Sequence, residues 1–150
     1  MERTLANKKI IGATPFKYNG IFFKSELEVR IYKTLIENGI TPKYEEFTAV
    51  LWDGFKPTIP FYERVGKKAR ELTLNMKKLI DMTYTPDFTF ELNGLFVVIE
   101  AKGYENDTFP IKKKLFRKFL EHYEKPSIFF EIYSKKDLLQ ALEIVKNTNL

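Results

Sequence analysis

The pair Asn93-Gly94 lies between two runs of alternating residues, TYTPDFTFEL and LFVVIEAKG. An Asn-Gly pair in this setting is typical of a two-residue type I′ turn, which joins two antiparallel strands and fixes their alignment. The sequence therefore predicts strands over about 84–92 and 95–102. Counting outward from the turn places Asp87 opposite Glu100, with both side chains on the same side of the sheet.

The predicted strand pair has one apolar face and one charged face. The apolar face is expected to pack against the core, and its residues alternate along both strands: Phe88, Phe90, Leu92, Leu95, Val97, Ile99 and Ala101. The other face carries Asp87, Thr89, Glu100 and Lys102. Directly opposed like charges destabilise a strand pair, so the two carboxylates need a compensating group. Either Lys102 or a divalent cation would supply it.

Two carboxylates on neighbouring strands offer the oxygen ligands that Mg²⁺ takes, and they leave room for water and phosphate oxygens. A Mg²⁺ held there would polarise a phosphate and activate a water for in-line attack. Lys102 would orient that water or stabilise developing charge. The alternative interpretation is a solvated cluster of surface charges, because the motif is short enough to arise by chance.

A third candidate carboxylate, Glu28, lies in a helix predicted from Ser25 to about Asn38. Its apolar stripe is Leu27, Ile31 and Leu35, and Gly39 follows as a C-terminal cap. Glu26 has Arg30 four residues further on and is expected to form a surface ion pair. Glu28 has no such neighbour, so it is a candidate for the site; the alternative is that it only completes a capping box with Ser25.

The remaining segments predict one α/β domain over residues 1–150, with a central mixed sheet flanked by helices. Residues 1–20 are expected to form an N-terminal arm or loop. Further predicted elements are a strand over 42–52, a helix over 110–123, a strand over 127–134 and a final helix to about 147, which begins with the capping pair Ser134 and Asp137. Residues 53–82 are predicted only as an insertion of uncertain structure, with one candidate strand leading into Met82.

Composition excludes several kinds of site. The chain has no cysteine, which excludes disulfides and thiolate metal sites, and its single histidine, His122, argues against zinc. No glycine-rich phosphate loop is present, so no nucleotide cofactor is expected.

The sequence shows neither a signal peptide nor a long apolar run, which predicts a cytoplasmic protein without a membrane segment. The net charge of +5 favours an anionic partner.

Together these segments resemble the PD-(D/E)xK nuclease superfamily. The matching residues are SELE at 25–28, YTPDF at 84–88 and IEAKG at 99–103. Within the superfamily the chain is most similar to small phage-type endonucleases, including the Holliday-junction-resolving enzymes of DNA recombination. The resemblance implies a restriction-endonuclease-like fold and hydrolysis of DNA phosphodiesters with Mg²⁺, for which Mn²⁺ would substitute. A phage-encoded protein of this kind would act in the host cytoplasm.

The resemblance also implies roles for individual residues. Asp87 and Glu100 take the metal-ligand positions, Glu28 the helix carboxylate and Lys102 the catalytic lysine. Basic residues are then candidates for DNA binding: Lys112, Lys113 and Arg117 on the helix after the motif, and Lys67 and Lys68 in the insertion. For any single one of these, an ordinary solvated surface position is the alternative.

Branched DNA is the expected substrate, and a homodimer is the expected assembly, because cutting two strands requires two sites. The alternatives are a transposon-type or restriction-type endonuclease, or a non-catalytic DNA-binding module with the same fold.

Overall fold

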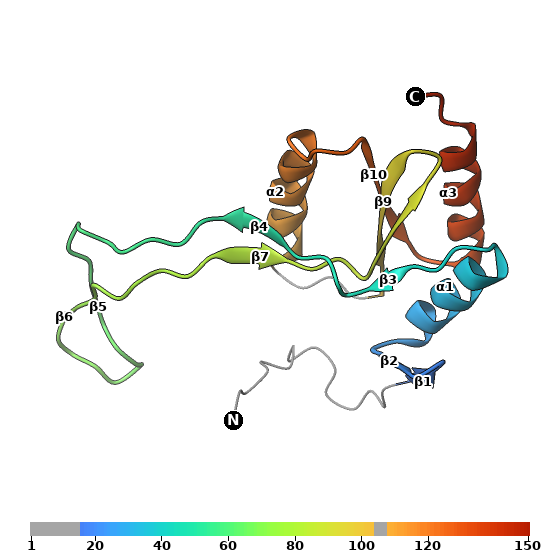
Figure 1. Cartoon of the computed structure of the whole chain (residues 1–150). Helices are drawn as coiled ribbons and strands as arrows, with labels where there is room; N and C mark the ends of the chain where they lie inside the picture. Colours follow the sequence, from blue (N-terminus) through green and yellow to red (C-terminus); the bar gives the residue numbers. More distant parts are fainter. Residues whose placement is uncertain (1–15, 104–107) are drawn as a thin grey trace.

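A four-stranded mixed sheet forms the centre of the molecule (Figure 1). The computed structural model describes residues 16–103 and 108–150. The strand order is β10-β9-β8-β3, in which β3 spans Lys43–Tyr44, β8 Phe88–Leu92, β9 Leu95–Ala101 and β10 Ser127–Ile132. Strand β9 runs antiparallel to β8 and parallel to β10. The predicted α/β class with a central mixed sheet is confirmed.

The hairpin at the centre of this sheet has the predicted register. Leu92 pairs with Leu95, and Phe88 pairs with Ile99. Asn93 and Gly94 have φ angles of 52° and 73°, the positive values that a type I′ turn requires at both positions. The Asn93 side-chain amide donates to the carbonyl oxygens of Val145 and Thr148, each at 2.9 Å, and so ties the turn to the end of the last helix.

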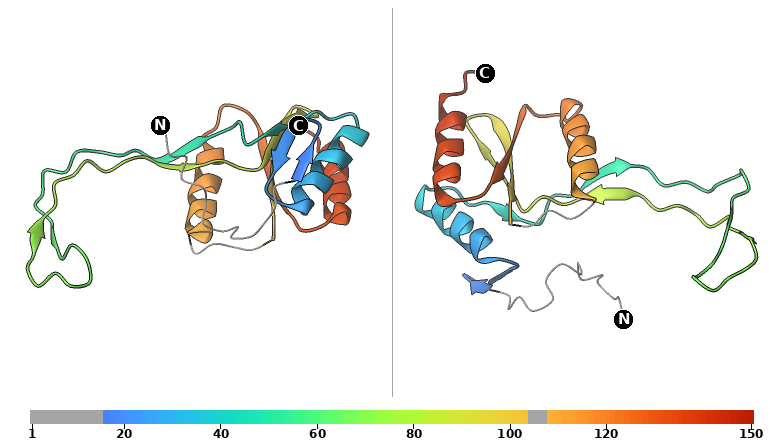
Figure 2. Two further views of the ribbon diagram at one scale, coloured as in Figure 1. Left: turned by 90° about the horizontal axis from the view of Figure 1, so that it is seen from below. Right: turned by 180° about the vertical axis from the view of Figure 1, so that it is seen from behind.

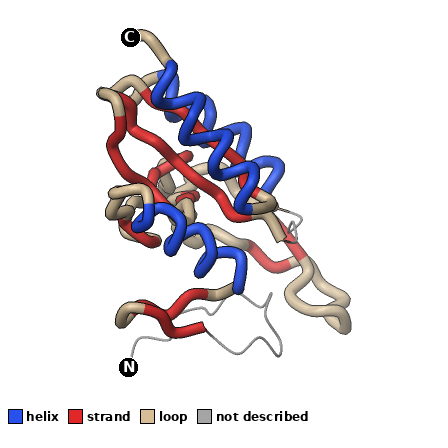
Figure 3. The backbone as a smooth tube through the Cα atoms, turned by 90° about the vertical axis from the view of Figure 1, so that its right-hand side faces the viewer, coloured by secondary structure: helices blue, strands red, loops and turns tan. Residues whose placement is uncertain are grey.

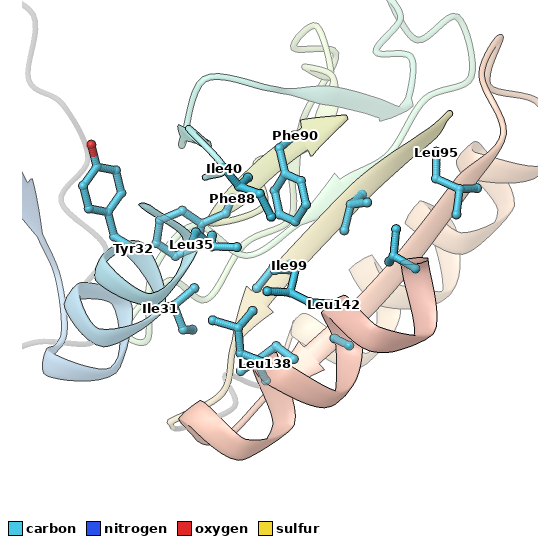
Figure 4. Packing of buried hydrophobic residues seen from close by; sticks show 14 of the residues in the cluster. Ile31, Tyr32, Leu35, Ile40, Phe88, Phe90, Leu95, Ile99, Leu138 and Leu142 are labelled. Atoms are coloured by element: carbon cyan, nitrogen blue, oxygen red, sulfur yellow. The ribbon is translucent and has the colours of Figure 1, made fainter. Parts of the chain in front are cut away.

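Helices cover both faces of the sheet. Helices α1 (Glu26–Glu37) and α3 (Lys135–Asn147) pack on the predicted core face, in a cluster that joins Ile31 and Leu138 to Phe88 and Ile99 (Figure 4). Helix α2 (Phe109–Glu121) covers the opposite face, where Phe116 packs in a second cluster with Val98. The face that carries the predicted site is therefore apolar farther along the strands. Among the described helices, none is long and apolar enough to cross a membrane.

Two predicted strands are each divided in the structure. The prediction over 42–52 becomes β3 and β4 (Ala49–Trp52), which pair with different strands because the chain turns at Glu45, where φ is 50°. The prediction over 84–92 becomes β7 (Met82–Tyr84) and β8. Pro86 lies between them, and proline has no amide hydrogen to donate to a sheet.

The expected N-terminal arm is only partly described. Residues 1–15 lie outside the described part of the chain. Residues 16–20, expected to be loop, instead enter a small hairpin of β1 (Phe16–Tyr18) and β2 (Ile21–Phe23). This hairpin lies beside α1 (Figure 3). Its turn is at Asn19 and Gly20, which both have positive φ.

The insertion of uncertain structure is a long two-stranded arm that extends away from the rest of the molecule (Figures 1 and 2). We define the arm as residues 50–83. Strands β4 and β7 pair at its base, and β5 (Tyr62–Glu63) pairs with β6 (Thr73–Leu74) near its tip. Between these pairs Phe55 forms an isolated bridge with Leu79. No residue of the arm is buried.

Candidate active site

The hairpin brings two of the predicted site residues to one end of the sheet. Asp87 immediately precedes β8 and Glu100 lies near the end of β9, so the antiparallel register, continued by one residue, sets them opposite each other. An Asp87 carboxylate oxygen accepts a hydrogen bond of 2.7 Å from the amide of Ala101. This bond fixes the Asp87 side chain against the strand that carries Glu100.

The Asp87 carboxylate is held in an environment that disfavours its charge. Burial raises its pKa well above the ordinary value, and the nearby charges of Glu100 and Glu28 raise it further. The hydrogen bond from Ala101 acts in the opposite direction. Asp87, Glu100 and Glu28 are thus close enough to interact electrostatically, as the sequence predicts.

The Glu100 carboxylate is also partly desolvated, and burial raises its pKa. Three interactions oppose that effect by stabilising the charged form: a hydrogen bond donated by the Tyr84 hydroxyl, the charge of Lys102 and a hydrogen bond from the Asp87 backbone. Lys102 is buried, and its ammonium group lies 3.2 Å from the centroid of the Phe109 ring at the start of α2. All four predicted catalytic residues therefore lie in one region.

Glu28 has both of the roles that the sequence left open. Its amide donates to the Ser25 hydroxyl at 3.2 Å, as in a capping box. Its carboxylate is buried and accepts from the hydroxyl of Tyr44 at 2.6 Å and from the amide of Lys24 at 3.0 Å. The capping bond uses the Glu28 backbone amide, so the carboxylate can bind Tyr44 on β3. Strand β3 pairs with β8, the strand that follows Asp87.

Three residues near the site were missed by the sequence interpretation. Tyr44 and Tyr84 each hold one carboxylate through a hydroxyl group, and burial together with that carboxylate raises the pKa of each tyrosine. Glu131 on β10 pairs in register with Glu100. A single charged residue inside the apolar run SIFFEI was a signal that could have drawn attention to Glu131.

The five predicted DNA-binding residues lie in two separate places. Lys112, Lys113 and Arg117 are on α2, where Arg117 is exposed and Lys113 forms an ion pair of 2.8 Å with Glu131. Lys113 is therefore engaged within the fold at the edge of the site. Lys67 and Lys68 are exposed in the loop between β5 and β6, at the far end of the arm.

The side chains present fit a Mg²⁺ ion only if water or substrate completes its ligands. Within residues 16–103 and 108–150, no three carboxylates, histidines or cysteines converge closely enough to hold a metal by themselves. Mg²⁺ commonly binds one or two carboxylates and takes its other ligands from water and phosphate. Asp87 and Glu100 suit such a site, and Glu28, which is bonded to Tyr44, would act beside them.

A groove of about 470 Å³ lies elsewhere along the sheet and is lined by residues that include Ile40, Thr89 and Tyr123. It contains none of the four predicted catalytic residues. The candidate active site and this groove are therefore separate places on the sheet.

A protein-family model described as "Protein of unknown function (DUF1064)" matches residues 8–136. No curated protein and no solved structure matches the chain. The matched range contains the whole central hairpin and all four predicted catalytic residues, from Glu28 to Lys102.

Proposed function

This chain belongs to the DUF1064 family, and we propose that it is a Mg²⁺-dependent DNA endonuclease with a PD-(D/E)xK-type site on a restriction-endonuclease-like fold. The observation that carries the proposal is the pair Asp87 and Glu100. A tight turn and a backbone hydrogen bond hold these two partly desolvated carboxylates together at the ends of adjacent strands. A bound cation would offset the repulsion between them.

The neighbouring side chains suit hydrolysis of a phosphodiester. Bound Mg²⁺ would polarise the phosphate and lower the pKa of a ligated water. Lys102, which lies beside Glu100 and against Phe109, is placed to orient the attacking water or to stabilise charge on the phosphate. Tyr84 and Tyr44 hold the carboxylates of Glu100 and Glu28 in place. By resemblance, the products carry 5′-phosphate and 3′-hydroxyl ends.

The proposed substrate is branched DNA, such as a four-way junction. This choice rests on the resemblance to Holliday-junction-resolving enzymes. Lys102 lies just past the end of β9, which carries Glu100, and the next described helix, α2, carries positive charge. Basic side chains there suit contact with the phosphate backbone and give no reason to expect recognition of particular bases.

Cleavage assays test this proposal. The wild-type protein is incubated with a four-way junction, nicked duplex, linear duplex and supercoiled plasmid, in Mg²⁺, Mn²⁺ or EDTA. We expect cleavage only with metal and preference for the junction. Asp87→Asn and Glu100→Gln are expected to lower the rate at least about 100-fold, since even residues that only support metal ligands typically contribute 10–100-fold.

The matched control is Glu91→Gln, which changes an exposed carboxylate on the same hairpin, paired with Lys125 outside the site. Its cleavage rate should equal that of the wild type. If the wild-type protein binds the junction but cuts none of the four substrates in any metal, the non-catalytic DNA-binding module is the correct alternative. Equal cutting of all four substrates would instead remove the preference for branched DNA.

A further inference from the structure

The arm exposes an unusual amount of apolar surface. Twelve large hydrophobic side chains of residues 50–83 are exposed: Val50, Trp52, Phe55, Ile59, Phe61, Tyr62, Val65, Leu72, Leu74, Leu79, Ile80 and Met82. The largest exposed fractions are 81% for Ile80, 78% for Ile59 and 66% for Leu72. Soluble monomers rarely expose apolar patches larger than a few hundred Å², so a concentration of exposed apolar side chains in one segment points to a site of interaction.

The arm has little to stabilise it within its own chain. Among residues 16–103 and 108–150 its strands form two-stranded sheets only, β4 with β7 and β5 with β6, and no residue between 50 and 83 is buried. An isolated two-stranded hairpin is at best marginally stable in water. A stable arm therefore needs another apolar surface to pack against.

We propose that the arm is a dimerisation element, which packs against a second copy of this chain around a two-fold axis. The size of the surface fits this partner. An aromatic side chain buries roughly 150–250 Å², and an aliphatic one roughly 60–120 Å², the area that its free energy of transfer implies at about 25 cal/mol per Å². Taking roughly half of these areas for the four aromatic and eight aliphatic side chains gives on the order of 500–1,000 Å² per copy. A stable protein–protein interface buries about 800 Å² per partner.

The chemistry of the arm also fits a second copy better than DNA. Most of the exposed hydrophobic side chains are aliphatic, and aliphatic groups such as Ile59 and Ile80 gain little from a phosphate backbone. The two-stranded sheet of β4 and β7 has open edges that can pair with the same edges of another copy. In a two-fold dimer each copy presents the same patch, so a self-complementary apolar arm suffices.

Charge decides how the interface should respond to salt. The arm has seven lysines and arginines and four aspartates and glutamates, so two arms in contact repel each other weakly on balance. Salt screens that repulsion, whereas it weakens contacts with DNA steeply. A dimer held by apolar contact should therefore persist, or become tighter, as the salt concentration rises.

The test is the oligomeric state of the full chain without DNA or metal, measured by analytical ultracentrifugation over a range of protein and salt concentrations. The wild type is expected to be a dimer. The double variant Ile59→Asp, Ile80→Asp places charges at the two most exposed hydrophobic residues of the arm. Because both lie outside the hydrophobic core, the central sheet and its helices should still fold. We expect its dimer dissociation constant to rise at least about 100-fold.

The matched control is Ile111→Asp, which changes a 59% exposed isoleucine on α2, outside the arm, and should leave the dimer intact. Circular dichroism checks that all variants fold. A wild type that is monomeric at every concentration, or a double variant that dimerises as well as the wild type, would overturn the proposal. Neither result depends on nuclease activity, so failure of the dimer and failure of the proposed function are distinguishable.

Discussion

At the scale of single residues, Asp87 shows a conflict between stability and the proposed function. Burial and two neighbouring carboxylates raise its pKa, so its charged form is less favourable in the folded protein than in the unfolded chain. The folded state therefore loses stability as the pH rises from the unfolded pKa of Asp87 through its raised folded pKa. Below that window the penalty is absent, because the group is protonated in both states.

Replacing this charge should consequently stabilise the protein in the absence of metal. Asp87→Asn removes the charge and keeps an oxygen that can accept the 2.7 Å hydrogen bond from Ala101. At pH 7 without metal we expect its Tm to exceed that of the wild type by about 2–4 °C, the shift that 1 kcal/mol produces in a chain of this size. Thermal unfolding at pH 7 and near pH 3.5 measures the effect, and the difference should vanish at the lower pH.

Glu91→Gln serves as the control. The pKa of exposed Glu91 is lowered by its hydrogen bond with Lys125, so removing the Glu91 charge should not raise the Tm. Mg²⁺ should raise the Tm of the wild type and leave that of Asp87→Asn unchanged. An Asn variant less stable than the wild type at pH 7 would contradict this account of Asp87.

Tyr84 is predicted to act as a positioning residue for Glu100. Tyr84→Phe removes the hydroxyl that donates to Glu100, while the ring keeps its contact with Phe116, whose centroid lies 4.8 Å away. We expect the metal-dependent cleavage rate to fall about 10–100-fold, as for other groups that hold metal ligands. The Mg²⁺ concentration for half-maximal rate should rise.

Because the lost hydrogen bond favours charged Glu100, the pKa of Glu100 should increase and the pH–rate profile should shift to higher pH. Tyr133→Phe, at an exposed tyrosine, is the control. A Tyr84→Phe enzyme with lower activity but unchanged Mg²⁺ and pH dependence would assign Tyr84 a purely structural role.

At the scale of elements, sequence interpretation succeeded where local chemistry decides the structure. The Asn93-Gly94 turn fixed the register of β8 and β9, and the serines at 25 and 134 cap the helices that follow them. It failed where contacts between distant segments decide. Within the described residues, β4 and β7 pair only with each other, across an insertion without an alternating pattern. Tyr44 and Tyr84 each reach their carboxylate across 16 residues of sequence.

The arm depends on a close approach of its two strands at Gly54. A Cβ atom at this position would lie 2.2 Å from the carbonyl oxygen of Leu79 and 2.6 Å from the carbonyl carbon of Ile80. Gly54→Ala should therefore separate the strands and break the 2.7 Å hydrogen bond between the Gly54 amide and Asp81. We expect a weaker dimer in analytical ultracentrifugation and a Tm of the sheet domain close to that of the wild type.

Gly103→Ala is the matched control, because a Cβ atom there meets no atom of the described part of the chain within 4 Å. It should leave the oligomeric state unchanged. If Gly54→Ala dimerises normally, the geometry of the arm does not determine the association.

At the scale of the whole molecule, the two groups of basic residues are far enough apart to contribute separately to the proposed DNA binding. Lys112 and Arg117 lie on α2 beside the site, and Lys67 and Lys68 lie at the tip of the arm (Figure 1). In a dimer held by the arms, the tips would lie near the interface, and the α2 helices would remain with their own sites. The proposed junction substrate would then contact α2 at each of the two sites.

Neutralising each group tests this arrangement. We expect Lys112→Gln with Arg117→Gln to weaken junction binding and to reduce the slope of log K against log salt by about 2, close to one unit per lost phosphate contact. Lys67→Gln with Lys68→Gln should change the slope less, because those residues lie far from the site. Fluorescence anisotropy with a labelled four-way junction in Ca²⁺, at several salt concentrations, measures both slopes.

Lys113→Gln is a distinct case, since it breaks the 2.8 Å ion pair with Glu131 and should lower the Tm as well as the affinity for the junction. A larger slope change from the tip pair than from the α2 pair would place the DNA along the arm and contradict the arrangement.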